Sequence, residues 1–290
     1  MSFLDHIHRV NRHDMAGFRP FLIGPDIAGY VRHAFAERLR RFPDVFDVEP
    51  ASVHLSARLE NVEARTAAVA DVVAVLVEDG IVPKLRFEEF PVLAEPGGPV
   101  LMRLNRGAVP NFGIIAFGVH LNGYVRKPDG LHLWIGRRSR TKNVAPGKLD
   151  NMVAGGQGDG LGPWETLIKE SAEEAGLPEA LASQARPVGA ISYTMEMGPD
   201  RAGDSRQDGL RRDVLYCYDL EVPGDFIPVC QDDELEDFTL LPVAEVRRLV
   251  DETEDFKFNC NLVITDFLVR HGYLGPDHPD YLKIVSGLHR

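Results

Sequence analysis

Residues 149–178 read LDNMVAGGQGDGLGPWETLIKESAEEAGLP, a glycine-rich passage followed at once by a segment dense in glutamate. Proline is favoured at the first position of a helix, and glycine commonly ends a helix in the left-handed conformation. We therefore expect Pro163 and Gly176 to bound a helix of about three turns. The glycines before it allow the backbone to bend closely around a bound group.

Three glutamates of this predicted helix share one side of it. Glu173 and Glu174 follow Glu170 by three and four residues, a spacing that brings helical side chains together. Like charges at that spacing cost roughly a few tenths of a kcal/mol per pair when nothing balances them. Glu165 and Lys169, an opposite pair in the favourable order, are expected to offset part of this cost.

Two interpretations fit the clustered glutamates. Acidic clusters alone are most often the solvated face of a surface helix. The other interpretation is a site for a hard divalent cation, because Mg²⁺ takes oxygen ligands and is usually held by carboxylates together with substrate phosphates. The glycine-rich passage favours the cation site, since backbone amides in such a loop can approach a bound phosphate closely.

The same residues resemble the Nudix box, whose pattern is G-x5-E-x7-R-E-U-x-E-E-x-G-U, with U an aliphatic residue. The matching positions are Gly155, Glu170, Glu173, Glu174, Gly176 and Leu177. Lys169 stands where arginine is usual, Ser171 where an aliphatic residue is usual, and Leu161 where the first glutamate is usual. In the family that first glutamate contributes to structure more than to metal binding, so these departures concern the loop geometry more than the chemistry.

The resemblance implies an α+β protein in which a smaller α+β accessory domain precedes a Nudix α/β/α sandwich around a mixed sheet. We expect the accessory domain over residues 1–110 and the Nudix domain, with C-terminal helices, over residues 111–290. The resemblance further implies that Glu170, Glu173 and Glu174 hold Mg²⁺ or Mn²⁺ and act in catalysis. The expected reaction is attack by water on a phosphorus of a diphosphate, with the cation neutralising the diphosphate and lowering the pKa of water.

One branch of the family, associated with thiamine pyrophosphokinase, is similar to this chain in three stretches: FGIIAFGVHLNGYV, LWIGRRSRTKNVAPGKLDNMVAGG and KESAEEAGLPE. In that branch the box commonly carries lysine and lacks the first glutamate. The leading hypothesis is hydrolysis of thiamine diphosphate, or its damaged analogues, to the monophosphate and phosphate. Two alternatives stay open: a hydrolase of nucleoside di- or triphosphates, including 8-oxo-guanine nucleotides, and a catalytically silent Nudix module that binds a metabolite.

A further catalytic carboxylate is expected in the acidic stretch QDDELEDF. In this superfamily a carboxylate from a downstream loop often joins the metal or orients the water. Glu234 is the first choice for this role and Glu236 the second. A solvated acidic loop explains the same residues nearly as well.

Phosphate contacts are expected from the basic stretch RRSRTK and from the glycine loop. Arg138 and Arg140 would share one face of a strand, and guanidinium groups fit phosphate oxygens. Gly155 and Gly156 would offer their backbone to the same substrate. An exposed basic strand end is the competing explanation for the arginines. A lone histidine in a β-run, such as His120, is expected to be structural.

Composition limits the classes of function. The 290 residues carry a formal net charge of −12, which repels nucleic-acid backbones, so we expect a small diphosphate and no nucleic-acid polymer as the partner. The three cysteines form no CxxC pair, which indicates reduced thiols and no zinc site. The first residues lack a signal-peptide core, and no run of about 18 apolar residues occurs, so we expect a cytoplasmic protein without membrane contact.

Periodicity predicts the remaining elements. Apolar residues at three-and-four spacing predict helices over residues 26–42, capped by Asp26, and over residues 62–77. Residues 198–212 are expected to form a mobile polar loop between two strands. For the N-terminal region three roles stay open: a cover for the active site, a wall of the substrate pocket, or the interface of a homodimer.

Overall fold

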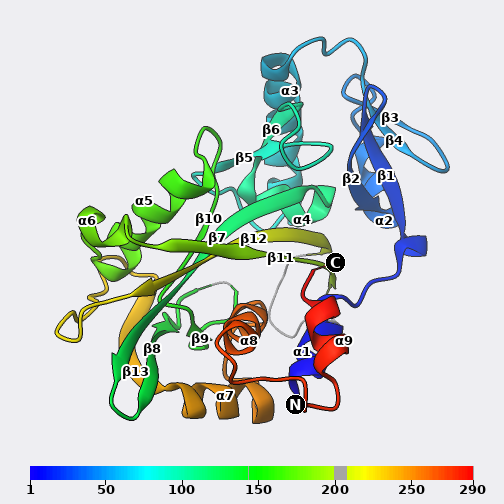
Figure 1. Cartoon of the computed structure of the whole chain (residues 1–290). Helices are drawn as coiled ribbons and strands as arrows, with labels where there is room; N and C mark the ends of the chain where they lie inside the picture. The colour runs from blue at the N-terminus through cyan, green and yellow to red at the C-terminus, as the bar shows by residue number, and fades with distance from the viewer. Residues whose placement is uncertain (143, 199–207, 290) are drawn as a thin grey trace.

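The computed structural model of the protein describes residues 1–142, 144–198 and 208–289. Figure 1 shows two parts: a smaller α+β region at the upper right, and a larger part in which helices flank a long mixed sheet. This architecture confirms the predicted fold class, an α/β/α sandwich preceded by a smaller α+β region.

The smaller region contains a four-stranded sheet in the order β2-β1-β4-β3. Strands β1 and β2 form an antiparallel hairpin, and β4 joins β1 in parallel. The helices α2 and α3 share one apolar core with these strands. The bounds are β1 Phe18–Ile23, β2 Asp26–Arg32, α2 His33–Leu39, β3 Phe46–Val48, β4 Val53–Leu55 and α3 Val62–Glu78.

The helix predicted over residues 26–42 is wrong in its first half. Residues 26–32 pair with β1 as strand β2, and only α2 is helical. Gly29 shows how tightly this strand is packed, because an added Cβ would lie 2.3 Å from the carbonyl oxygen of Phe112. A short apolar pattern is compatible with either period, and the hydrogen bonds to β1 decide the outcome.

The helix predicted over residues 62–77 is confirmed as α3. The side chain of Asn61 caps its first turn by accepting a 2.8 Å hydrogen bond from the backbone amide of Ala64. After α3 the chain forms a hairpin and two short helical turns that lead into the main sheet. Their bounds are β5 Glu89–Val92, β6 Met102–Asn105, η2 Arg106–Ala108 and α4 Val109–Phe112.

The main sheet has seven strands in the order β11-β12-β7-β8-β13, with β10 beside β7 and β9 beside β8. Strands β12 and β7 run parallel, whereas the other neighbours are antiparallel, so the sheet is mixed. The bounds are β7 Ile115–Lys127, β8 Gly130–Arg138, β9 Leu149–Asp150, β10 Val153–Gly156, β11 Arg186–Met197, β12 Gly209–Glu221 and β13 Leu235–Pro242.

Helices cover both faces of the main sheet. α5 and α6 lie over one face, where Leu167 and Ala175 share a core with Val119 and Leu121. α7 and α8 cover the other face, and α1 packs against both α8 and α9 although it lies at the opposite end of the sequence. The bounds are α1 Phe3–Val10, η1 Met15–Gly17, α5 Pro163–Ala175, α6 Glu179–Ala182, α7 Val243–Glu252, α8 Cys260–Arg270 and α9 Tyr281–Gly287.

The glutamate-rich helix is confirmed as α5, with the expected boundaries. Pro163 occupies the first turn, and Gly176 ends the helix with a left-handed φ of 60°. Of the loop expected over residues 198–212, residues 199–207 lie outside the described residues. Residues 209–212 are strand rather than loop, because they pair with β11 at the start of β12.

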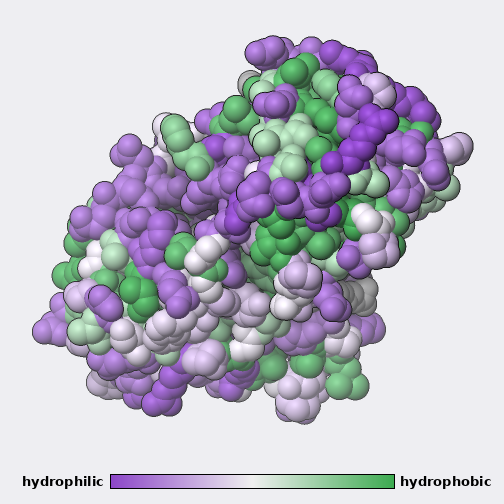
Figure 2. Space-filling model, turned by 90° about the horizontal axis from the view of Figure 1, so that it is seen from above, coloured by the Kyte–Doolittle hydropathy of each residue, from purple (hydrophilic) through white to green (hydrophobic). Residues whose placement is uncertain are grey.

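The surface is dominated by polar side chains. Figure 2, which looks at the molecule from above Figure 1, shows hydrophilic residues over most of this face and apolar ones in separate patches. Among the described residues, no helix combines the length and the apolar character needed to cross a membrane.

Candidate active site

Strand β10 brings the glycines of the box against the glutamates of α5. It pairs with β7 along one edge and packs against α5. At Gly155 no side chain fits, because an added Cβ would lie 2.2 Å from Cγ of Glu170. The glycine therefore lets the side chain of Glu170 lie directly on the strand backbone.

Glu174 is the most deeply buried of the three box glutamates. Its side chain is 4% exposed, and its Oε2 accepts a 2.8 Å hydrogen bond from the backbone amide of Ala154. Burial raises the pKa of Glu174 to about 8, and the nearby charges of Asp150, Glu170 and Glu234 act in the same direction. A buried carboxyl of this kind gains from any cation placed beside it.

Lys169 neutralises the other two carboxylates. Its Nζ lies 3.0 Å from Oε1 of Glu170 and 2.6 Å from Oε2 of Glu173. The expected pairing with Glu165 is wrong, because Lys169 turns toward the side where two carboxylates concentrate negative charge. Glu165 stays in the first turn, where the helix dipole favours an acidic residue.

The residues present fit a Mg²⁺ or Mn²⁺ site. Glu170, Glu173 and Glu174 offer hard oxygen donors from one side of α5, which is the donor type these ions prefer. An ammonium group already lies between two of the carboxylates, so positive charge is stabilised at this position. Glu170 and Glu173 meet at Lys169, whereas Glu174 lies on the backbone amide of Ala154. Among the described residues, the donor atoms of these three glutamates do not all lie within 4.8 Å of one another, so their role as metal ligands stays a prediction.

Leu161 stands where the box usually has its first glutamate, and a different contact closes the box loop. Nε2 of Gln157 donates a 2.7 Å hydrogen bond to the carbonyl oxygen of Leu161. Ser171, the other unusual residue of the box, is fully buried, as an aliphatic residue would be at the same position. The three departures from the box pattern therefore leave the helix and its glutamates in place.

A cavity of about 250 Å³ lies beside β10, and both Gly155 and Gly156 line it. Its floor is the sheet, where Gly118 of β7 pairs with Leu215 of β12 and His120 lies two residues further along β7. Side chains alternate along a strand, and this spacing recurs in the lining at Ala116, Gly118 and His120 of β7 and at Arg211, Asp213 and Leu215 of β12. Gly118 leaves space there because it has no side chain.

The lining of this cavity is strongly cationic. Six basic side chains face two acidic ones; they are Arg86, Arg106, Arg138, Lys142, Arg211 and Lys257 against Asp213 and Glu234. A chain with a net charge of −12 thus builds a local site suited to an anion.

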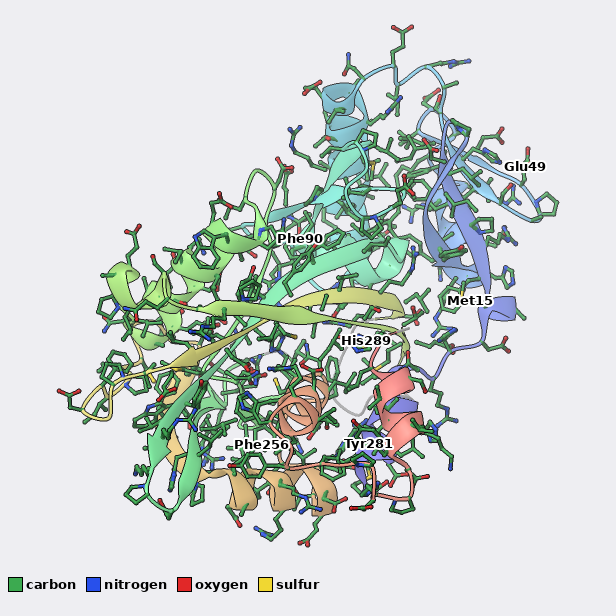
Figure 3. All side chains as sticks on the ribbon, in the orientation of Figure 1. Met15, Glu49, Phe90, Phe256, Tyr281 and His289 are labelled. Atoms are coloured by element: carbon green, nitrogen blue, oxygen red, sulfur yellow. The ribbon has the colours of Figure 1, made fainter. Side chains whose placement is uncertain are left out.

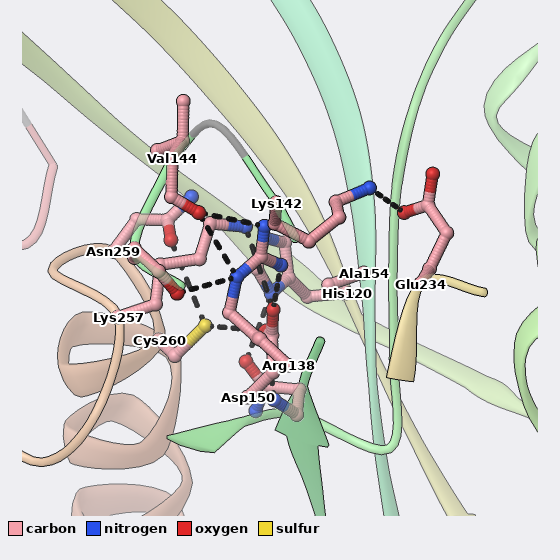
Figure 4. A network of polar contacts seen from close by, with 12 residues as sticks. His120, Arg138, Lys142, Val144, Asp150, Ala154, Glu234, Lys257, Asn259 and Cys260 are labelled. Atoms are coloured by element: carbon pink, nitrogen blue, oxygen red, sulfur yellow. Dashed lines mark hydrogen bonds and ion pairs between the residues drawn. The ribbon is translucent and has the colours of Figure 1, made fainter. Parts of the chain in front are cut away.

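Arg138 lines the cavity but is already fully engaged (Figure 4). Its Nη1 bonds to Oδ2 of Asp150 at 2.5 Å, and its other nitrogens donate to the carbonyl oxygens of Val144 and Ala145. Burial alone would raise the pKa of Asp150, but Lys257 and Arg138 hold it below its usual range. Arg138 therefore fixes the segment before β9 and adds positive charge to the cavity.

Arg140 lies outside the cavity. Its side chain is 83% exposed, and its backbone amide donates to Glu236. The expectation that Arg138 and Arg140 share one strand face is wrong, because β8 ends at Arg138 and the chain turns away. Arg140 fits the competing explanation, an exposed basic strand end.

The two glutamates predicted in the acidic stretch, Glu234 and Glu236, lie in different places. Glu234 lines the cavity, and its carboxylate lies 2.6 Å from Nζ of Lys142. Burial would raise the pKa of Glu234, but Lys142, together with the charges of Arg106 and Arg138, lowers it, and the net direction is downward. Glu236 lies at Arg140, away from the cavity.

His120 is a cavity residue that the sequence alone did not assign to the site. It is 3% exposed, its Nδ1 lies 2.9 Å from Oδ1 of Asn151, and burial lowers its pKa to about 4. Residues two apart on a strand share a face, so His120 lies on the same face of β7 as Gly118. This spacing could assign His120 to the site only once it was known which face of β7 meets the cavity.

His120, Asp150 and Cys260 also place one donor atom each within 4.8 Å of one another. Burial raises the pKa of the Cys260 thiol, which donates a 2.6 Å hydrogen bond to Asp150. Because Arg138 and Lys257 already balance Asp150, this cluster does not need a metal ion.

Comparison with known proteins identifies the family. The NUDIX domain family matches residues 118–262. Two Arabidopsis thaliana proteins, "Nudix hydrolase 20, chloroplastic" and "Nudix hydrolase 24, chloroplastic", are 43% identical over 298 and 291 residues, which is 99% of this chain and 77% of each relative. The chain belongs to the Nudix hydrolase family.

Residues 2–116 of this Nudix hydrolase match a second family, described as "Domain of unknown function (DUF4743)". Family membership confirms the predicted enzyme class, a Nudix-type diphosphate hydrolase that acts on small molecules. Nudix hydrolases generally require divalent metal ions, in agreement with the carboxylate face of α5. The branch, the substrate and the roles of individual residues stay predictions.

Proposed function

We propose that this Nudix hydrolase cleaves thiamine diphosphate, or its damaged analogues, to the monophosphate and phosphate. The observation that supports hydrolysis is the carboxylate face of α5 beside a cationic cavity. The choice of thiamine diphosphate rests on the resemblance of the box, with Lys169 and Leu161, to the thiamine-linked branch.

The box glutamates are proposed to hold the metal ion. Mg²⁺ or Mn²⁺ at Glu170, Glu173 and Glu174 would neutralise the diphosphate and favour attack of water on phosphorus. The ammonium group of Lys169 balances the charges of Glu170 and Glu173. We propose that it moves away from these carboxylates when the ion binds. Glu174 keeps its hydrogen bond to strand β10 and thereby orients the site.

Glu234 is proposed to orient the attacking water and accept its proton. It lines the cavity, and Lys142 keeps its carboxylate ionised at neutral pH. Gly155 and Gly156 are proposed to present their backbone to the phosphates, while Arg138 contributes positive charge. We propose no substrate contact for Arg140, since it projects into solvent.

A phosphate-release screen with Mg²⁺ tests the substrate. We expect the highest kcat/KM with thiamine diphosphate or its oxidised forms, measured against nucleoside di- and triphosphates that include 8-oxo-guanine nucleotides. Preference for a nucleotide would replace the proposed substrate but keep the reaction class. Absence of phosphate release with every compound, together with saturable binding of one of them, would favour a silent binding module.

A further inference from the structure

The N-terminal region contributes side chains to the cavity of the Nudix domain. Arg86 precedes β5, Phe90 lies within β5, and Arg106 follows β6, and all three line the cavity. They belong to the residues matched by the second family, outside the match to the NUDIX domain. The cavity therefore has walls from both regions.

The β5–β6 hairpin is anchored on the box loop. The backbone amide of Asp159 donates a 2.9 Å hydrogen bond to the carbonyl oxygen of Glu89. Nε of Arg103 on β6 bonds to Oδ2 of Asp159 at 2.5 Å. These contacts fix the hairpin relative to the glycines, so the side chains beside it reach the cavity from a defined direction.

Gly156 leaves room for the β5–β6 hairpin, just as Gly155 leaves room for the side chain of Glu170. A Cβ added at Gly156 would lie 2.9 Å from Cζ of the Phe90 ring and 3.5 Å from Cζ of Arg106. Figure 3 labels Phe90 where the N-terminal region meets the main sheet. Successive residues of a strand point to opposite faces, so Glu170 and Arg106 approach β10 from opposite faces. Among the described strands β10 pairs only with β7, so a diphosphate that contacts both side chains would lie across the unpaired edge of β10.

Arg86 and Arg106 both line the cavity here and repel each other, and the charges of Glu88 and Glu234 offset part of this repulsion. The guanidinium of Arg86 has no ion pair or hydrogen bond within the described part of the chain, although the residue is half-buried. Burial lowers the pKa of Arg86, and the charge of Arg106 lowers it further. Arg106 pairs with Glu88 and lies over the Phe90 ring, with Cζ 5.6 Å from the ring centroid. An anion bound between these guanidinium groups would remove the repulsion and use their donors.

We propose that Arg86 and Arg106 bind the phosphate groups of the substrate, so that the N-terminal region forms the second wall of the active site. Phe90 positions Arg106 by supporting its guanidinium. The location of the diphosphate at the glycines rests on the proposed function. The ligand chemistry is a diphosphate anion, alone or esterified.

Binding of inorganic diphosphate and steady-state kinetics test this subsite on the full chain. We compare Arg86→Gln, Arg106→Gln and the double variant with Arg58→Gln, which removes an equal charge at an exposed position of the same region. Each cavity variant is expected to raise KM and the Kd for inorganic diphosphate roughly tenfold or more, because a charge-assisted hydrogen bond is lost. The Mn²⁺ affinity of each cavity variant should stay near that of the wild type, as should all values for Arg58→Gln.

One result would contradict the proposed phosphate subsite. A double variant with wild-type Kd for inorganic diphosphate and wild-type KM would overturn the subsite. If the wild type releases no phosphate from thiamine diphosphate, the measurement of inorganic diphosphate binding still tests the subsite. Weaker binding by the double variant than by the wild type then supports the subsite, whereas the proposed substrate is wrong. Arg86→Lys and Arg106→Lys keep the charge, and they should recover part of the lost affinity if the arginines contact phosphate rather than only shape the fold.

Discussion

Oε2 of Glu174 accepts a 2.8 Å hydrogen bond from the backbone amide of Ala154, which ties the box helix to the strand that carries the glycines. The same carboxyl is buried next to other acidic groups. Glu174 therefore has two proposed functions: it holds α5 against β10, and it supplies a carboxyl group that would ionise when a cation binds beside it.

Glu174→Gln is expected to lower kcat by roughly 10²–10³-fold, because metal-ion catalysis supplies several kcal/mol of transition-state stabilisation. The amide oxygen of glutamine can still accept from Ala154, so the fold should be kept. Activity at saturating Mg²⁺, with circular dichroism and Tm as the folding control, measures both effects. Wild-type turnover in this variant would remove Glu174 from the proposed site.

The metal-free enzyme should lose stability as pH rises from about 5 to 8. Glu174 is protonated in the folded protein up to a pKa of about 8, whereas its ordinary pKa is 4.5. The folded state therefore binds more protons than the unfolded state in this window, and unfolding becomes easier on the order of a few kcal/mol as the carboxyl ionises. Urea unfolding in EDTA across this range measures the slope.

Glu174→Gln is the control for this pH dependence, since glutamine does not titrate. Its stability curve should be flatter than that of the wild type, and Mg²⁺ should stabilise the wild type more at pH 8 than at pH 6. Parallel curves for the two proteins would show that Glu174 is not the responsible group.

Gly155→Ala should damage the site although the change is a single methyl group. The added Cβ would lie 2.2 Å from Cγ of Glu170, so the glutamate must leave the strand. We expect a loss of about 1–3 kcal/mol in unfolding free energy together with a large fall in kcat/KM. Gly158→Ala is the matched control, because its Cβ would meet only the carbonyl oxygen of Glu89 at 3.8 Å. Equal behaviour of the two variants would contradict the proposed packing.

Arg138 and Arg140 should differ sharply despite their proximity in sequence. Arg138→Met leaves the buried carboxylate of Asp150 without its closest partner, and breaking a buried pair costs about 3–5 kcal/mol. Arg140→Met removes an exposed side chain and should change stability by less than about 0.5 kcal/mol. Chemical unfolding and phosphate release, measured side by side, check the contrast. A stable Arg138→Met protein would argue against the described network.

Local patterns were sufficient for the box and its helix. Pro163 and Gly176 act within about four turns of chain, so α5 and its boundaries could be predicted from the sequence. The strand β2 could not, because the apolar spacing of residues 26–32 suits a helix and only the hydrogen bonds to β1 select the strand.

The sequence by itself determined the chemistry of this protein: three carboxylates on one helix, a glycine loop before them and membership of a diphosphate-hydrolysing family. The tertiary structure decided which other side chains join them. Arg86 and Arg106 lie on a separate region, His120 on the sheet floor and Glu234 on a later loop, yet all line one cavity. Contacts between residues so distant in sequence depend on which strands pair, in which register, and on which faces pack together. The spacing of residues along the chain does not predict these pairings.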